Sequence, residues 1–250
     1  MIIFKTLLAS VRLFIFVIAL IIAYPLFLLS INTFIKYNIK TGFKFRKDFL
    51  TFINPVLGIR NKIEGIPPVQ PAIYVSNHRG ILDFFVTLKY LNTYILSKEE
   101  VRHIPILGKA SEYTGIFFVK REDKNSRKAT RKAIKDIIES GENVLIFVEG
   151  TTNVEKLTAD FKIGTFEVAA NNGIPVVPVA EEYKYKEDLW KDKSTWQQWV
   201  SSVGKCFTDV KLAFGPVLQS DDPQYLLNES KRWIDNKLLE MQKDWSKAFD

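Results

Sequence analysis

The chain has 250 residues, 47% of them hydrophobic and 25% charged, and its formal net charge is +7. This composition is typical of a globular protein and excludes an intrinsically disordered one. The length allows one fair-sized domain, or one domain with a small appendage. The positive charge indicates a polyanionic partner, such as nucleic acid, an anionic lipid surface or a phosphorylated small molecule.

The N-terminal segment predicts a membrane anchor. Leu13 to Ile35 reads LFIFVIALIIAYPLFLLSINTFI and carries no charged residue. As a helix it is long enough to cross a hydrocarbon core of about 30 Å, and it is longer than the apolar run of a signal peptide. Pro25 interrupts the run, so a kinked or two-piece helix lying partly in the interface competes with a straight span. Both forms stay open at this point.

The basic residues around this run predict its orientation. The heavier basic flank, from Lys36 to Lys47, follows the run, which by the positive-inside rule places the main domain on the cytoplasmic side. We therefore predict a membrane anchor with a basic flank over residues 1–48 and a main domain over residues 49–250. No RNA- or DNA-binding motif is found, and the anchor favours lipid over nucleic acid as the partner.

After about Asn54, short β-rich runs alternate with longer charged stretches of helical period. Strands are expected at residues 72–77, 116–121, 143–149, 175–180 and 210–215. Helices are expected at residues 82–92, 106–114, 125–140, 164–172, 187–201 and 221–245. This alternation predicts the α/β class, with a largely parallel central sheet covered by helices and preceded by the hydrophobic helical anchor. Functional residues of such sheets gather in the loops after the carboxyl ends of the strands.

His78 and Asp83, in VSNHRGILDFF, follow the first expected strand. One interpretation is structural, with a strand ending in a polar turn and Asp83 in the favourable first turn of a helix. The other is chemical, because imidazole titrates near neutral pH and a carboxylate fixes its tautomer and stabilises its protonated form. Within one continuous helix a five-residue offset would not align the two groups. The pair therefore requires His78 in the turn and Asp83 just inside the helix.

Two further strand ends carry polar groups. Arg121 ends GIFFVKR and is either a solvated charge or part of an anion site. FVEGTTN places Glu149, Gly150 and Thr151 at another strand end, where an ordinary capped turn is the simple alternative. The two prolines of IPVVPVA indicate by themselves only an edge or a rigid entry to a strand.

Together, and in this order, the four segments resemble the glycerolipid acyltransferase family typified by 1-acylglycerol-3-phosphate acyltransferase. NHRGILD is similar to the N-H-x4-D block of that family, GIFFVKR to its G-x-x-F-[IV]-x-R block and FVEGTTN to its F-P-E-G-T-R-S block. IPVVPVA is similar to its proline-containing fourth block, and FKIGTFEVA to the run that follows the third. The resemblance covers roughly residues 50–215.

The resemblance implies acyl transfer from acyl-CoA or acyl-carrier protein to the hydroxyl of a lysolipid at a membrane, with no metal and no cofactor. It implies that His78 is the general base and that Asp83 orients it. The remaining expected roles are in acceptor binding, and they fall to Lys98, Arg121, Glu149, Gly150, Thr151 and Thr152. No cysteine or serine is placed by a motif as a nucleophile.

Two departures from the third block bear on the acceptor. Val148 stands where the family has proline, and Thr152 where it has an arginine expected to grip phosphate. The leading acceptor is 1-acylglycerol-3-phosphate, which would give phosphatidate in phospholipid synthesis. Another lysophospholipid or a lyso-aminolipid is the alternative. A lipid thioester hydrolase and an inactive lipid-binding module are the rivals of a different class.

Overall fold

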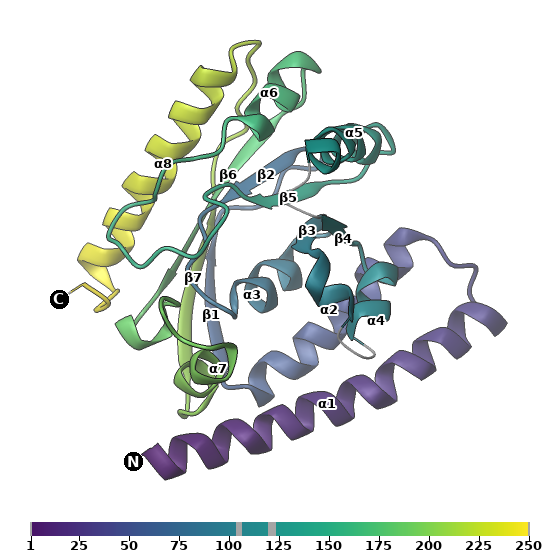
Figure 1. Cartoon of the computed structure of the whole chain (residues 1–250), viewed down its shortest axis with the longest axis vertical. Helices are drawn as coiled ribbons and strands as arrows, with labels where there is room; N and C mark the ends of the chain where they lie inside the picture. Colours follow the sequence, from purple (N-terminus) through teal and green to yellow (C-terminus); the bar gives the residue numbers. More distant parts are fainter. Residues whose placement is uncertain (1, 104–106, 120–123, 250) are drawn as a thin grey trace.

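The computed structural model describes residues 2–103, 107–119 and 124–249, and its centre is a seven-stranded sheet (Figure 1). The strand order is β1-β7-β6-β2-β5-β3-β4. Neighbouring strands pair in parallel except β6 and β7, which are antiparallel. The strands are β1 (Ile59–Glu64), β2 (Ile73–Ser76), β3 (Tyr94–Lys98), β4 (Ile116–Val119), β5 (Val144–Phe147), β6 (Val176–Tyr183) and β7 (Thr208–Phe214).

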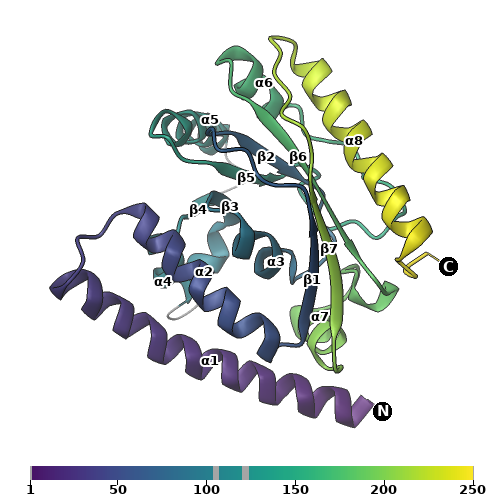
Figure 2. The ribbon, with the colours of Figure 1, turned by 180° about the vertical axis from the view of Figure 1, so that it is seen from behind.

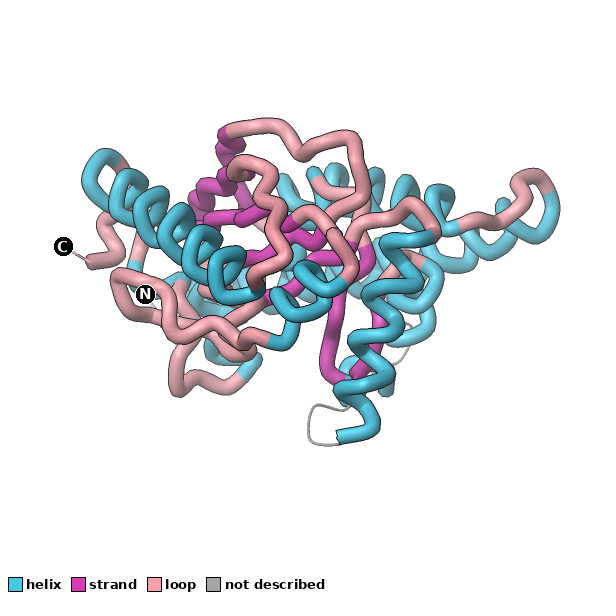
Figure 3. The backbone as a smooth tube through the Cα atoms, turned by 90° about the horizontal axis from the view of Figure 1, so that it is seen from above, coloured by secondary structure: helices cyan, strands magenta, loops and turns pink. Residues whose placement is uncertain are grey.

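Helices cover both faces of this sheet, as Figures 1 and 2 show from opposite sides. They are α1 (Ile2–Thr33), α2 (Ile39–Val56), α3 (Asp83–Tyr90), α4 (Leu107–Tyr113), α5 (Lys124–Glu139), α6 (Gly164–Asn171), α7 (Thr195–Val203) and α8 (Pro223–Asp244), with 3-10 turns η1 (Glu99–His103) and η2 (Lys186–Asp188). One core cluster joins the sheet to α2, α3 and α7, and a second joins it to α6 and α8. Figure 3, seen from above, shows the strands between these helical layers. The predicted α/β class is confirmed.

The five expected strands are present, but β1 and β3 were not predicted, and β6 continues to Tyr183, beyond the expected end at residue 180. The expected helix at 187–201 is wrong over its first half. The chain there forms η2, and α7 begins only at Thr195, because Ser194 and Gln197 form a capping box. A helix start fixed by two side chains is a local signal that periodicity alone does not locate.

The segment after the apolar run, predicted as a basic flank, forms part of helix α2. α2 is amphipathic, and Arg46 points into the protein, donating to the carbonyls of Thr93 at 3.0 Å and Leu91 at 3.1 Å. Burial lowers the pKa of Arg46 to about 9. Four lysines of the same segment are exposed, namely Lys36, Lys40, Lys44 and Lys47. Arg46 thus stabilises the packing of α2 against the rest of the protein, and it is not available to a lipid surface.

Helix α1 lies along one side of the molecule, beside α2, and continues through Pro25 (Figures 1 and 2). By length and composition it could cross a membrane, and only 11% of its most apolar window is buried, unlike the mostly buried core helix of a soluble protein. Its first third is fixed to α7 and to the loop after it. Trp199 donates its indole N–H to the Ala9 carbonyl at 3.0 Å, and Arg12 donates to the carbonyl of Val203 at 2.7 Å.

Candidate active site

His78 and Asp83 lie in direct contact at the carboxyl end of β2. The distance between His78 Nδ1 and Asp83 Oδ2 is 2.6 Å. β2 ends at Ser76, an extended loop carries His78, and Asp83 is the first residue of α3. The loop therefore brings together two side chains that a continuous helix would place on different faces.

Three further donors hold the Asp83 carboxylate. The backbone N–H of Arg79 donates to Oδ2 at 2.7 Å, and that of Gly80 donates at 3.0 Å. The Tyr183 hydroxyl donates to Oδ1 at 2.6 Å. A group that receives so many donors is a carboxylate, which can only accept. Nδ1 of His78 therefore carries its hydrogen toward Asp83, and Nε2 keeps a free lone pair with which to take a proton.

Two aromatic rings fix the plane of the imidazole. The ring of Phe147, the last residue of β5, stacks on His78 with 4.3 Å between centroids and 21° between planes. Phe84, on α3, meets His78 edge-on at 5.9 Å. The His78 side chain is 15% exposed, so one edge of the ring stays open to a substrate.

Glu149 ties the loop after β5 to the loop after β2. Its Oε1 accepts the backbone N–H of His78 at 3.0 Å, and its Oε2 accepts the Asn153 amide at 2.8 Å and the Ala159 N–H at 2.7 Å. The His78 carbonyl in turn accepts the N–H of Asn153 at 2.8 Å. Both oxygens of this buried carboxylate are thus engaged inside the protein. Glu149 sets the position of the histidine backbone.

Three of the other predicted acceptor residues, Gly150, Thr151 and Thr152, directly follow Glu149 in the same loop. Gly150 turns the chain with φ +77°, a value that glycine adopts without strain. Thr151 is exposed and Thr152 is half-buried. Lys98 ends β3, the strand next to β5. Arg121 lies outside the described residues, two positions after the end of β4 at Val119, so its predicted role stays a prediction.

Arg79, directly after His78, is a second link that the motifs did not reveal. Its guanidinium is 1% exposed and donates to the carbonyls of Asn153 at 3.1 Å and Lys156 at 3.1 Å. It also pairs with Glu182 at 3.1 Å. An arginine between a histidine and a glycine in a loop gives no sequence signal for burial, because burial requires the partners supplied by distant elements.

The carboxyl end of β6 supplies the carboxylate partner of Arg79, which is Glu182. Glu181, Glu182 and Tyr183 are all 0% exposed. The Asn77 amide donates to the Glu181 carbonyl at 2.8 Å, and its oxygen accepts the Glu181 N–H at 2.8 Å. Oε2 of Glu181 accepts from the Thr87 hydroxyl of α3 at 3.0 Å. The sequence signal was present as three polar residues directly after an apolar strand, but the expected strand stopped before them.

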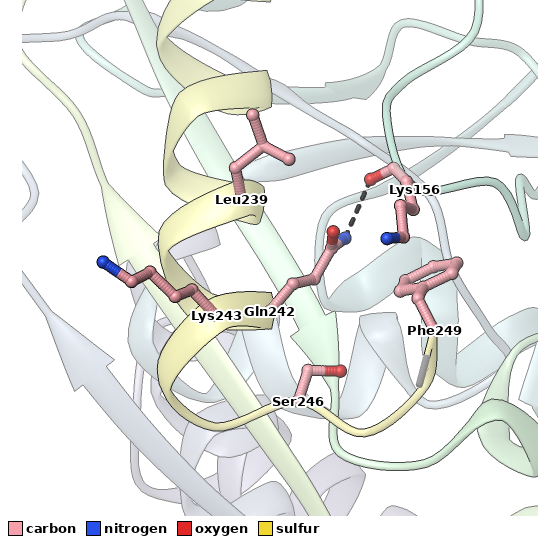
Figure 4. Close-up of a pocket in the computed structure, with 6 residues that line it drawn as sticks. All are labelled: Lys156, Leu239, Gln242, Lys243, Ser246 and Phe249. Carbon is pink, nitrogen blue, oxygen red and sulfur yellow. Dashed lines mark hydrogen bonds between the residues drawn. The ribbon is translucent and has the colours of Figure 1, made fainter.

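A hollow of about 230 Å³ lies behind this layer, near the C-terminus (Figure 4). It is lined by Lys156, Leu239, Gln242, Lys243, Ser246 and Phe249. Gln242 donates to the Lys156 carbonyl at 2.8 Å and to Glu182 at 2.8 Å. Neither His78 nor Asp83 lines this hollow, and its volume is below that of ordinary ligand pockets. The hollow therefore borders Gln242, which contacts Glu182, and it is separate from His78 and Asp83.

The comparisons with known proteins agree with the family that the four motifs indicate. The family model described as Acyltransferase matches residues 59–182. A 1-acyl-sn-glycerol-3-phosphate acyltransferase of Brassica napus is 34% identical over 47% of this chain and 35% of its own length. The chain thus spans about a third of that relative. A lysophosphatidylcholine acyltransferase 2B of Mus musculus is 30% identical over 86% of this chain and 45% of its own.

A structural neighbour agrees over almost the whole chain. The crystal structure of the 1-acyl-sn-glycerophosphate acyltransferase PlsC from Thermotoga maritima has a TM-score of 0.77 and 21% identity, covering 99% of this chain and 100% of its own. At this identity the likeness establishes a shared fold. The chain belongs to the glycerolipid acyltransferase family, as its motifs predicted.

Proposed function

We propose that the protein is a membrane-bound acyltransferase that moves a fatty acyl group from a thioester to the free hydroxyl of a lysolipid. The observation that carries the proposal is the 2.6 Å contact between His78 and Asp83 at the carboxyl edge of the sheet. A histidine whose Nδ1 is held by a buried carboxylate has the tautomer and the charge support that a general base needs. The donor is acyl-CoA or acyl-carrier protein.

The proposed reaction proceeds without an acyl-enzyme. Nε2 of His78 takes the proton of the acceptor hydroxyl as its oxygen attacks the thioester carbonyl carbon. The new C–O bond forms, the C–S bond breaks, and the proton passes from the imidazolium to the leaving thiolate. Asp83 stabilises the imidazolium while it exists. This chemistry accounts for a site that joins a base to a carboxylate and needs no nucleophilic side chain.

The leading acceptor is 1-acylglycerol-3-phosphate, with phosphatidate as the product. Its phosphate would be held by Lys98 and Arg121, while Gly150, Thr151 and Thr152 would line the acceptor side. Glu149 would shape that side, since both of its oxygens are already engaged. A bidentate guanidinium is the strongest phosphate ligand among the side chains, so Arg121 would be the chief contact.

Thr152 favours a second candidate, a lysolipid whose head group is larger or less anionic. This half-buried threonine replaces the arginine expected in the third block, so one phosphate ligand is missing. A lyso-ornithine lipid O-acyltransferase of Rhodobacter capsulatus is 31% identical over 53% of this chain and 49% of its own length. The mouse relative is named for lysophosphatidylcholine. Both names fit a site that accepts other lysolipids.

For membrane attachment, we propose that α1 lies in one leaflet along the surface, and that the main domain faces the cytoplasm. Lys5 pairs with Glu187 at 2.9 Å, and Arg12 holds the loop after α7, so the start of α1 is docked on the domain. The opposite side of α1 exposes large apolar side chains, which are Phe4, Leu7, Phe14, Ile22, Leu26 and Leu29. A helix with one side docked and the other apolar fits an interfacial position.

The test is mass spectrometry of the lipids formed when the purified full chain receives a panel of lysolipids with acyl-CoA or acyl-carrier protein as donor. The expected result is an acylated product from at least one lysolipid, lost in His78→Ala. Thiol release without any acceptor would indicate the hydrolase instead. Lipid binding with neither reaction would indicate the inactive binding module, and either result would overturn the proposal.

A further inference from the structure

We propose that Tyr183 is a positioning residue of the active site, whose hydroxyl fixes the Asp83 carboxylate and thereby the orientation and basicity of His78. The inference rests on the proposed function, since it assigns a third member to the His78–Asp83 pair. Tyr183 lies outside the four motifs, at the end of β6. It is joined to the pair by a single strong contact.

That contact is short and shielded from water. Tyr183 Oη lies 2.6 Å from Asp83 Oδ1, and both side chains are 0% exposed. A hydrogen bond to a charged acceptor is stronger than one between neutral groups, and exclusion of water strengthens it further. Burial raises the pKa of Tyr183 well above its ordinary value, which favours the protonated hydroxyl that donates to Asp83.

The loop that carries the pair is built to let this hydroxyl approach. A Cβ placed on Gly80 would lie 2.9 Å from the Asp188 carbonyl oxygen and 3.3 Å from Tyr183 Oη. Glycine at this position therefore leaves the space that the tyrosine needs. Gly80 also donates its N–H to Asp83, so the loop and the tyrosine hold the same carboxylate from two sides.

The backbone of Tyr183 is itself held in place. Ser246, after the end of α8, donates its hydroxyl to the Tyr183 carbonyl at 2.7 Å, and the N–H of Lys247 donates to the Lys184 carbonyl at 2.7 Å. The Tyr183 N–H donates to Glu182 Oε1 at 3.0 Å. The phenol thus stands on a fixed strand end, and it can hold Asp83 without moving when the imidazole gains or loses a proton.

The groups facing Asp83 determine what happens when the hydroxyl is removed. His78 faces it from the loop after β2, and Tyr183 and Glu181 face it from β6. Arg79 contributes its backbone N–H, while its guanidinium pairs with Glu182. Without the phenol, more of the carboxylate charge is directed at the imidazole. The imidazolium then gains stability, and the pH at which His78 titrates moves upward.

The experiment compares Tyr183→Phe with Tyr74→Phe in the full chain. Tyr74 is a matched control, since it is also 0% exposed, and its hydroxyl lies 3.5 Å from the Pro68 carbonyl. For Tyr183→Phe we expect kcat to fall roughly tenfold, because the freed Asp83 carboxylate no longer holds the imidazole in the orientation for proton transfer, with an unchanged acceptor KM. For Tyr74→Phe we expect both constants to stay within about twofold of the wild type.

A second measurement does not depend on turnover. The chain has two histidines, so His103→Gln leaves His78 as the only imidazole signal in an NMR titration. In that background we expect Tyr183→Phe to move the His78 midpoint upward by roughly half a pH unit or more, and Tyr74→Phe to leave it unchanged. An unmoved midpoint, or equal losses of kcat in both variants, would overturn the positioning role. A wild type without acyl transfer would instead overturn the proposed function.

Discussion

Arg79 and Glu182 form an ion pair in which both side chains are almost wholly buried, with 1% and 0% exposed and 3.1 Å between Nη2 and Oε2. Because the guanidinium also donates to three carbonyls of the loop after β5, one residue joins the loop of His78 to the proposed acceptor loop. We expect Arg79→Met to lower the free energy of unfolding by about 3–5 kcal/mol, since it leaves Glu182 buried without its cation. Urea unfolding of the purified protein measures the loss.

The double variant Arg79→Met/Glu182→Met separates the ion pair from the loop contacts. Replacing both partners removes the unpaired charge, so most of the stability should return. The carbonyls of the loop remain without their donor in both variants, so we expect acyl transfer to be low in the double variant as well as in Arg79→Met. A double variant that recovered activity together with stability would contradict a role for Arg79 in holding the acceptor loop.

His78→Ala tests the general base. We expect the rate of acyl transfer to fall by roughly 10²–10⁴-fold, because the group that takes the hydroxyl proton is lost. Folding and membrane attachment should be unchanged, because the His78 backbone keeps its bonds to Glu149 and Asn153. His103→Ala is the matched control, since His103 is exposed in η1 and outside the motifs. Near-normal turnover in a folded His78→Ala protein would exclude the assignment.

Thr152→Arg distinguishes the two proposed acceptors. If the acceptor is lysophosphatidate, an arginine at this position adds a phosphate ligand, and turnover should be unchanged or improved. In that case Arg121→Ala should raise the acceptor KM sharply. If the native acceptor has a larger or less anionic head group, Thr152→Arg should damage the native reaction by placing an unpaired charge beside it. Assaying both variants with lysophosphatidate and with lyso-ornithine lipid gives the answer, and equal effects on all acceptors would show that residue 152 does not face the head group.

The sequence predicted the α/β class, the long apolar helix and the family, because these follow from periodicity and from motifs that are contiguous in the chain. It could not predict that Arg79, Glu181, Glu182 and Tyr183 form one buried layer. Polar residues in loops and at strand ends are ordinarily solvated, and only the pairing of β6 beside β2 brings these groups together. β3 was not predicted because YILSK is short and ends in polar residues, so it lacks the continuous apolar run of the predicted strands.

Glu181→Gln tests whether the buried Glu181 side chain carries a proton in the folded protein. Burial, and then the charge of Asp83, raise the pKa of Glu181 well above its ordinary value of 4.5, so the folded protein keeps a proton that the unfolded chain releases. The free energy of unfolding should therefore fall as the pH rises above about 4.5, by up to about 1.4 kcal/mol per pH unit from this group. Glutamine is neutral at every pH, so the variant should have a flatter profile and be more stable than the wild type at pH 8.

The control for this titration is Glu139→Gln at the exposed end of α5, where the side chain is 64% exposed. It should leave the slope of stability against pH unchanged when urea unfolding is followed from about pH 5 to 8. If Glu181→Gln and the wild type had the same slope over this range, Glu181 would not be the group that holds the proton.

The docking of α1 on the domain predicts where its first residues lie at a membrane. Cys206, the single cysteine, is exposed on the loop that Arg12 holds, so in the wild type it reports the side of the membrane occupied by the domain. Lys5→Cys/Cys206→Ser moves that report to the docked side near the start of α1, where the Lys5 side chain is 27% exposed and lies beside Glu187 of the domain. If α1 lies in one leaflet, a membrane-impermeant maleimide should label both proteins on sealed vesicles. If α1 spans the bilayer, the cysteine at position 5 should stay unlabelled until detergent opens the vesicles, because the apolar run would carry the helix start to the far side. Protection of that cysteine beside a labelled Cys206 would therefore exclude the interfacial arrangement.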